Sequence, residues 1–330
     1  MTETQHSQSW TFASGRAAVL EARMAPMGLL DKLVQAAHAE DVTQALRGFL
    51  IGENLADPER LDKADVESRR FYHGMVEDLQ RLCPAPWVAE LLLVQRDLQG
   101  LKNHVKRAHL GMDVEPIESR YADEVWERLW TGLETDVPAV PKAVAERVRE
   151  RIAGRDAAAL FDAAFDSASL WALCEAAESA GSEFIREYFV RLDTARGVEL
   201  LWRAKALGQP EQVQQLLAEG RRDADLFASL LERDTEDWTD LLAAAMPGLA
   251  VEEMASARGE ARVRAFVHAA DRWLMSYVRD ARFVPFGPER VFGCLVGLLT
   301  EGHNVALAAG GRANGIAPEV LARHLKATYV

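Results

Sequence analysis

Cysteine and positive charge are both scarce in this chain of 330 residues. The three cysteines, Cys83, Cys174 and Cys294, are far apart and odd in number. We therefore expect buried free thiols in a reducing compartment rather than a disulfide framework or a cysteine-rich metal site. Lys and Arg number 38 against 51 Asp and Glu, which gives a formal net charge of −13. That balance disfavours binding to nucleic acid and electrostatic docking on anionic lipid.

Long apolar runs are missing as well. The longest run near the C-terminus, Val291 to Thr300, is bounded by charged residues and is too short to span a membrane. The opening MTETQHSQSW lacks the basic and then apolar pattern of a signal peptide. We expect a cytoplasmic protein with no direct membrane insertion, which meets a membrane only through other proteins.

Familiar catalytic motifs are not found either. The chain has no G-x-x-x-x-G-K-[ST] phosphate loop, no H-E-x-x-H zinc motif and no G-x-S-x-G nucleophile elbow. His104 and His109 are five residues apart, so they diverge on a helix and are poor joint metal ligands. The Gly-rich stretch 310–315 follows a helical pattern and indicates a helix end. We expect no catalytic residue, no cofactor and no metal.

What the chain does have is a composition that favours helices. Hydrophobic residues make up 49% and charged residues 27%, as in folded proteins. Ala, Leu, Glu and Arg are abundant, and no run of alternating β-branched residues predicts a strand. We therefore expect an all-α fold.

Caps and prolines predict where several helices begin and end. The predicted helices run from Arg16 to Met24, from the Asp57-Pro58 pair towards Leu82, from about Val88 to Leu110, and from Ser182 to about Leu207. Proline is expected at the first helical position at Pro210, Pro288 and Pro318. Six tryptophans within apolar helical patterns are expected in the core rather than at an interface. They are Trp126, Trp130, Trp171, Trp202, Trp238 and Trp273.

One spacing occurs three times, about a hundred residues apart. A polar or acidic residue stands 14 residues before a glycine in each copy, with at least one arginine between them. The pairs are Asp97 and Gly111, Thr194 (beside Asp193) and Gly208, and Glu301 and Gly315. Such self-similarity indicates a repeated helical unit. We expect three units, at residues 10–113, 114–211 and 212–330, packed on one another through short linkers.

The three repeated acids allow two interpretations. Each is expected at or near the start of an apolar helix, where an unpaired charge is costly. An acid there could be a general acid or base or an ion carrier, or it could form a buried ion pair that sets how helices cross. We favour the ion pair because one architectural device explains the recurrence better than three active sites. Arg16, Arg107 and Arg203 are the candidate partners. Replacing Asp97 by Ala should then strongly destabilise the first unit.

The C-terminal stretch 286–325 resembles the end of the C subunit of archaeal and bacterial A/V-type rotary ATPases, the subunit called d in eukaryotic V-ATPases. The family pattern is a Gly-Pro helix start, an apolar helix, a Glu, an Asn three residues on, and a Gly-rich turn before a short final helix. The matching residues are Gly287, Pro288, Glu301, Asn304 and Gly315.

The other two copies are similar to the family's D-x-x-N-L…R-x-K-x-x-G pattern. The first copy matches at Asp97, Leu101, Arg107 and Gly111, with Gly100 where Asn is usual. The second matches at Asp193, Arg203, Lys205 and Gly208, with Arg196 in the Asn position and one extra residue. The stretch SGRAAVLEARM resembles the family's opening, with Arg16 and Arg23 matching.

The resemblance implies a funnel of three pseudo-threefold-related helical units on the cytoplasmic face of the membrane-embedded proteolipid ring. Its partners would be that ring and the central axle subunits of D and F type. Its role would be non-catalytic, coupling axle rotation to transport of protons or sodium. The alternative is a free-standing α-helical repeat scaffold that binds helical or peptide partners. A helical-bundle enzyme using Asp97 or Glu301 as an acid is disfavoured because no second catalytic group is placed near either.

Overall fold

The computed structural model describes residues 10–52, 54, 55, 61, 63–109, 139–153, 158–179, 181–219 and 221–330. Within these ranges the regular elements are all helices and no strand occurs, which confirms the all-α class. Contacts divide the chain into two compact units. Unit 1 is Met1–Ala89 with Met275–Val330, and unit 2 is Glu90–Leu274. The division into three repeats remains a prediction, and its first boundary, at 112–118, lies outside the described residues.

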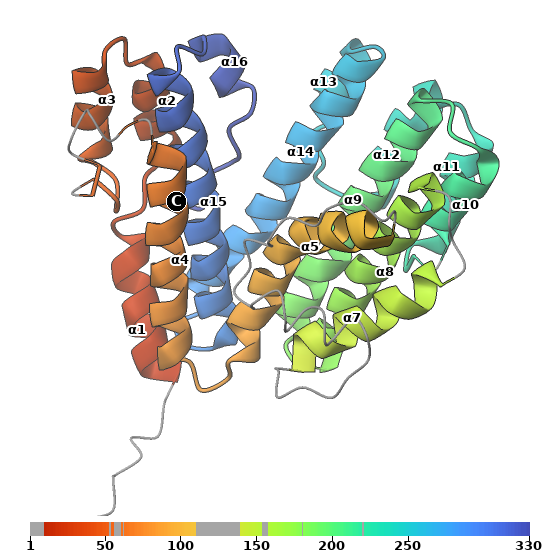
Figure 1. The fold of residues 1–330 in the computed structure, drawn as a ribbon, viewed down its shortest axis with the longest axis horizontal. Coiled ribbons are helices and arrows are strands. Elements are labelled where there is room, and N and C mark those ends of the chain that lie inside the picture. The colour runs from red at the N-terminus through yellow and green to blue at the C-terminus, as the bar shows by residue number, and fades with distance from the viewer. Residues whose placement is uncertain are drawn as a thin grey trace, which may run out of the picture. The chain divides into compact units, whose positions relative to one another are not determined.

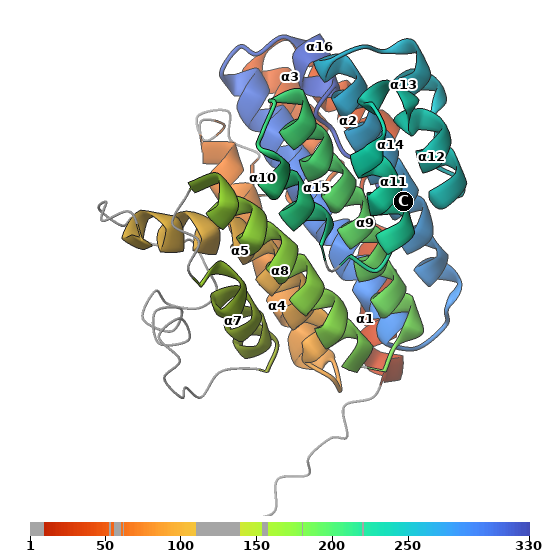
Figure 2. The ribbon, with the colours of Figure 1, turned by 90° about the vertical axis from the view of Figure 1, so that its right-hand side faces the viewer.

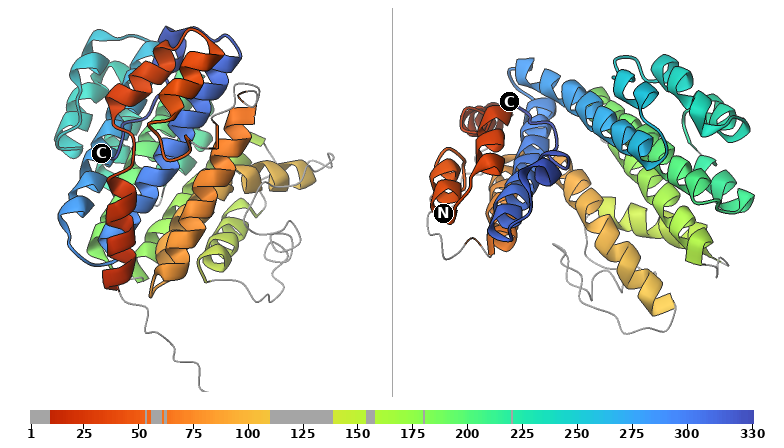
Figure 3. Two further views of the ribbon diagram at one scale, coloured as in Figure 1. Left: turned by 90° about the vertical axis from the view of Figure 1, so that its left-hand side faces the viewer. Right: turned by 90° about the horizontal axis from the view of Figure 1, so that it is seen from above.

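Unit 1 is arranged around one long helix near the C-terminus, α15 (Figure 1). Its elements are α1 (Trp10–Glu21), α2 (Met27–Gln35), α3 (Ala39–Leu46), α4 (Ala64–Leu82), η3 (Asp280–Phe283), α15 (Pro288–Ala313) and α16 (Pro318–Ala322). Helices α1 and α4 pack along α15, as the left panel of Figure 3 shows. The predicted Pro288 and Pro318 start α15 and α16.

Helix α15 is central because it is apolar on nearly every side. Glycines let neighbours approach it closely: a Cβ at Gly297 would lie 2.7 Å from the ring of Tyr329, and one at Gly302 would lie 2.9 Å from that of Tyr72. In the described part of the chain, α15 is the helix long and apolar enough to cross a membrane, and 78% of that apolar window is buried within the fold. Such burial is typical of a core helix.

Unit 2 is a second helical assembly, in which α8 packs against α7, α9 and α10 (Figure 2). Its helices are α5 (Trp87–His109), α7 (Ala139–Ile152), α8 (Ala158–Ser179), α9 (Glu183–Ala206), α10 (Glu211–Ala218), α11 (Ala224–Glu232), η2 (Thr235–Asp237), α12 (Trp238–Ala245), α13 (Glu252–Ser256) and α14 (Glu260–Arg279). The unit boundaries fall within α5 and α14. The ring of Trp202 packs at a tilt against those of Trp238 and Phe266 in a core cluster of this unit.

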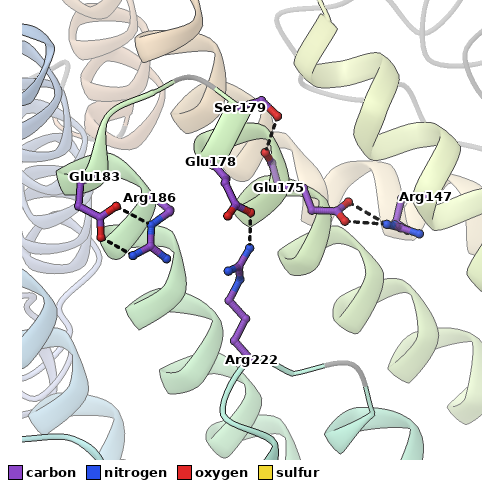
Figure 4. Close-up of polar contacts among 7 residues, drawn as sticks. All are labelled: Arg147, Glu175, Glu178, Ser179, Glu183, Arg186 and Arg222. Carbon is purple, nitrogen blue, oxygen red and sulfur yellow. Dashed lines mark hydrogen bonds and ion pairs between the residues drawn. The ribbon is translucent and has the colours of Figure 1, made fainter.

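Ion pairs on the surface of unit 2 join neighbouring helices. Arg147 of α7 pairs with Glu175 of α8 at 2.8 Å, and Arg222 pairs with Glu178 of α8 at 2.7 Å (Figure 4). Half-exposed pairs of this kind contribute little each to stability. The packing of α8 instead comes from a buried face of alanines together with Phe161, Phe165 and Leu173.

Most of the predicted helices are found, with shifted ends. Ser182 caps α9 by accepting a hydrogen bond from the N–H of Ile185, as predicted. Pro210 is the N-cap residue of α10 rather than its first helical residue. Asp57 and Pro58 lie outside the described residues, and α4 begins at Ala64.

The first helix runs from Trp10 to Glu21 rather than from Arg16 to Met24. The shift has a simple cause, because Ala13, Ala17 and Leu20 share one buried face that begins upstream of Arg16. All three cysteines are buried free thiols, as predicted.

Three of the six tryptophans confirm the core prediction: Trp202, Trp238 and Trp273 are buried. Trp171 is only half-buried, with the guanidinium of Arg147 4.5 Å from its ring centroid. Trp126 and Trp130 lie outside the described residues.

Candidate functional site

The three repeated acids lie inside long helices and not at their starts, so that part of the prediction is wrong. Asp97 stands ten residues after the start of α5, Asp193 ten after the start of α9, and Glu301 thirteen after the start of α15. Their exposed fractions are 3%, 5% and 5%. A carboxylate so deeply buried needs partners inside the protein. The structure supplies different partners at each position.

Asp193 is neutralised by Arg221, and both side chains are almost completely buried. Arg221 also donates from Nε to the carbonyl of Leu217 at 2.9 Å, which holds the guanidinium beside α9. Thr194, the next residue along α9, donates to the carboxylate of Asp223. Burial raises the pKa of Asp193, and the charge of Arg221 acts in the opposite direction. The result is a buried ion pair, the architecture we favoured, with a partner that we did not name.

Glycine at position 197 makes this ion pair possible. A Cβ there would lie 2.7 Å from the ring of Phe227 and 3.1 Å from Arg221. The guanidinium of Arg221 lies 5.7 Å from the ring centroid of Phe227. A side chain at Gly197 would therefore displace both the cation and the ring behind it.

The proposed partner Arg203 lies elsewhere. Its side chain is mostly exposed and pairs with Glu199, one turn earlier on α9, at 2.8 Å. Asp193 lies nearly three turns earlier than Arg203, about 15 Å along the axis. The correct cation is Arg221, which lies between α10 and α11 and is brought to Asp193 by tertiary folding.

Asp97 pairs with its neighbour Arg96, at 2.9 Å. The arginine side chain is 36% exposed, so this pair reaches the surface. The proposed partner Arg107 is ten residues further along α5, a rise of about 15 Å. Further along α5, Lys102 and Lys106 pair with Asp166 and Asp162 of α8, at 2.9 and 2.6 Å, and join the two helices.

Glu301 is held by hydrogen bonds from neutral groups. The hydroxyl of Tyr72 donates to one carboxylate oxygen at 2.5 Å, and the N–H of Ala25 donates to the other at 2.8 Å. Burial raises the pKa of Glu301, while the bonds from Tyr72, Ala25 and the backbone of Leu50 lower it. The proposed partner Arg16 is exposed on α1. The ion-pair prediction is therefore corrected at this position to a set of neutral donors.

Asn304, one turn after Glu301, binds the backbone of the C-terminal segment. Its Nδ2 donates to the carbonyl of Lys326 and its Oδ1 accepts from the N–H of Lys326, both at 2.9 Å. The side chain of Asn304 is fully buried. Its role is to hold residues 326–330 against α15.

Two of the three predicted glycine stops have the same geometry. Gly208 and Gly315 adopt φ of +61° and +71°, in the left-handed region that favours glycine. After α9, the N–H of Gln209 donates to Ala204, and after α15 the N–H of Ile316 donates to Gly311. Both ends are Schellman motifs. Gly111 lies outside the described residues.

Two further buried acids, Glu21 and Glu199, were missed, and Glu21 joins segments far apart in the chain. Glu21 lies on the inner face of α1, pairs with Arg290 and accepts a hydrogen bond of 3.1 Å from the hydroxyl of Tyr329. Burial raises the pKa of Glu21, and the charge of Arg290 opposes the rise. A signal was present in the sequence, because Glu21 follows Ala13 and Ala17 at helical spacing.

Glu21 and the three repeated acids are fully engaged in joining segments of the fold. Each carboxylate contacts a cation, a hydroxyl or a backbone N–H. Among the described residues, no three His, Cys, Asp or Glu side chains are grouped as a metal site requires. The chemistry visible at these positions is that of helix-to-helix linkage.

The function of a fold linked in this way is indicated by the family to which the chain is similar. No curated protein matches the chain. The model of the family described as ATP synthase (C/AC39) subunit matches residues 13–324, nearly the whole chain. The matched span includes all of the repeated positions, from Asp97 to Gly315. This chain therefore belongs to the ATP synthase (C/AC39) subunit family, as its motifs predicted.

Proposed function

We propose that this chain is the non-catalytic central-stalk subunit of a V/A-type rotary ATPase, and that it acts as a socket coupling the central axle to the proteolipid ring. The observation that carries the proposal is family membership over nearly the whole chain. The internal linkage is consistent with the role. A part that transmits torque needs helices fixed to one another, and buried polar links between distant segments supply that rigidity.

We further propose that residues 10–113, 114–211 and 212–330 are three related units forming a funnel. Two features support this proposal. A buried acid recurs in the middle of a long helix, at Asp97, Asp193 and Glu301. Gly208 and Gly315 end two of these helices with the same hydrogen-bond pattern. The different neutralising groups would then be divergence within a repeated plan.

The proposed partners are the axle subunits of D and F type and the proteolipid ring, on the cytoplasmic face of the membrane. The acidic excess of the chain suits a polar surface that receives the axle. Axle binding should then weaken as ionic strength rises, because salt screens charges on an exposed surface. An affinity that does not change with salt would refute the acidic axle surface.

The decisive experiment is purification of the tagged chain from detergent-solubilised membranes, with its companions identified by mass spectrometry. We expect the proteolipid and the axle subunits to be recovered together. A tagged cytosolic helical protein handled identically sets the background. Recovery of no proteolipid and no ATPase subunit would overturn the proposal.

A further inference from the structure

Helix α1 carries large apolar side chains on its outward face as well as on its inward face. Ala13, Ala17 and Leu20 are buried against unit 1, yet Phe12 is 66% and Val19 53% exposed on the other side. Large apolar side chains exposed on a helix whose other face is already packed indicate a candidate contact surface.

Two more phenylalanines are exposed at the end of η3 and in the connection that follows it to α15. Phe283 is 85% and Phe286 58% exposed, the former being the most exposed large apolar residue among those described. Phenyl rings bury 150–250 Å² each when covered. Single exposed apolar residues are common on protein surfaces, but three exposed phenylalanine rings together indicate a contact surface.

The segment carrying these rings is held in place. Arg290 donates to the carbonyl oxygens of Arg282 and Val284, at 2.7 and 3.5 Å. The N–H of Gly287 donates to Ser14 Oγ at 3.2 Å, which fixes the start of α15 against the first turns of α1. Phe12, Phe283 and Phe286 thus belong to one end of unit 1, and we call them the aromatic patch. Because their backbone is already ordered, binding through them costs little conformational entropy.

The charge beside the aromatic patch is opposite in sign to that of the chain. Arg16 lies one turn after Phe12 and is exposed, and Arg282 directly precedes Phe283 and is also exposed. Asp280 is an exposed acid on the same segment, and Glu289, in the first turn of α15, is half-buried, so one positive charge is in excess among the exposed charges. The whole chain, in contrast, carries −13. The patch is therefore complementary to an apolar surface that carries carboxylates.

We propose that the aromatic patch docks on another protein of the complex, at an apolar recess bordered by carboxylates. The inference rests on the proposed function, under which the polar acidic surface receives the axle and the apolar patch is left for the ring. Rigid aromatic anchors beside arginine are typical of protein–protein hot spots. An anionic bilayer is the weaker candidate because the net charge of the chain opposes its approach.

The test compares tagged wild-type chain with the double variant Phe283→Ala/Phe286→Ala in the purification from membranes. Leu207→Ala is the matched control, because Leu207 is a 74% exposed apolar residue of unit 2. We expect about a tenfold or greater loss of recovered proteolipid in the double variant, with axle recovery unchanged and the control equal to wild type. The melting temperature should not change, since both side chains are already solvated.

Each other outcome has a distinct meaning. Wild-type chain that recovers neither ring nor axle defeats the proposed function, and the patch assignment with it. Equal proteolipid recovery by wild type and double variant overturns the patch alone. Sedimentation of the purified chain with vesicles of phosphatidylcholine and phosphatidylglycerol, lost in the double variant, would assign the patch to a bilayer instead. A dimer in sedimentation velocity that the double variant abolishes would assign it to a second copy.

Discussion

Asp193 in unit 2 and Glu301 in unit 1 are both buried in the middle of a long helix but are stabilised differently. Asp193 is matched by a buried cation, Arg221. Glu301 is matched by a tyrosine hydroxyl and backbone N–H groups. The comparison teaches that the burial of an acid can recur while its partner changes. What recurs is the mid-helix position from which an acid can hold distant segments together.

The two solutions differ in what remains when the acid is removed. Removing Asp193 leaves a buried, uncompensated guanidinium, whereas removing Glu301 leaves neutral donors without an acceptor. A stranded charge in an apolar interior is the more costly of the two. The comparison can therefore be tested by substitutions that act on one solution at a time.

The largest effect is expected from Asp193→Ala. It should lower the free energy of unfolding by about 3–5 kcal/mol, because Arg221 would remain buried and unpaired. Urea denaturation followed by circular dichroism measures the change. The double variant Asp193→Leu/Arg221→Met should recover much of the loss, since it removes both charges. A single-variant loss below about 1 kcal/mol would contradict the buried-pair account.

Glu301→Ala should cost less, about 2–3 kcal/mol, because the hydroxyl of Tyr72 and the N–H of Ala25 would lose their acceptor. Glu301→Gln retains one acceptor oxygen and should lose less than the alanine variant. The same denaturation experiment applies. If Glu301→Ala proved as costly as Asp193→Ala, the distinction between the two solutions would fail.

Asp97→Ala should cost about 1–2 kcal/mol, the smallest loss among the three repeated acids. The partner Arg96 is 36% exposed and can turn to water once the carboxylate is gone. This is less than the strong destabilisation expected from the sequence alone. A loss equal to that of Asp193→Ala would support the strong destabilisation expected from the sequence. An unchanged melting temperature would show that Asp97 does not stabilise the fold as the other two acids do.

The ends of α9 and α15 have the same glycine geometry, so equivalent substitutions there should have equal effects. Gly208→Ala and Gly315→Ala should each cost about 1 kcal/mol, because alanine disfavours positive φ. Open space surrounds both positions, so no steric term is added. Gly74→Ala, at an uncrowded position inside α4, should instead be neutral or stabilising. Unequal losses at the two helix ends, measured by thermal denaturation, would argue against a common motif.

The smallest effect is a dependence on pH. Burial raises the pKa of Glu301 above its ordinary value of 4.5, so the folded state holds this proton more tightly than the unfolded state. The associated stability is full below pH 4.5 and is lost as pH rises through the raised pKa. The melting temperature of wild type relative to Glu301→Gln should therefore increase as the pH falls from 8 towards 5. A constant or opposite difference would contradict the raised pKa.

Local structure was largely predictable from the sequence. The all-α class, the Ser182 cap, the proline starts of α15 and α16 and the glycine ends at Gly208 and Gly315 depend on propensities and caps that act within a few residues. The ends of α1 were harder to predict, because the alternation of buried and exposed residues continues upstream of Arg16 without a cap.

Partners of the buried acids could not be predicted in the same way. The candidate partners Arg203 and Arg107 share helices with Asp193 and Asp97, and helical rise keeps them about 15 Å from these acids. Arg221 is 28 residues from Asp193, and Tyr72 is 229 residues from Glu301. Such pairings depend on tertiary packing. The mid-helix position of Asp97 and Asp193 could be read from the predicted helix ranges 88–110 and 182–207, which match α5 and α9 closely. The expectation that these acids stand near helix starts was therefore inconsistent with those ranges.

The most direct test of the central claim is to measure ATP hydrolysis and ATP-driven ion transport separately in membranes with and without this subunit. A coupling socket predicts that, without it, hydrolysis by the catalytic part continues while transport across the membrane is lost. Returning the purified chain should restore transport. Transport that persists without the subunit, or hydrolysis that disappears with it, would contradict the account.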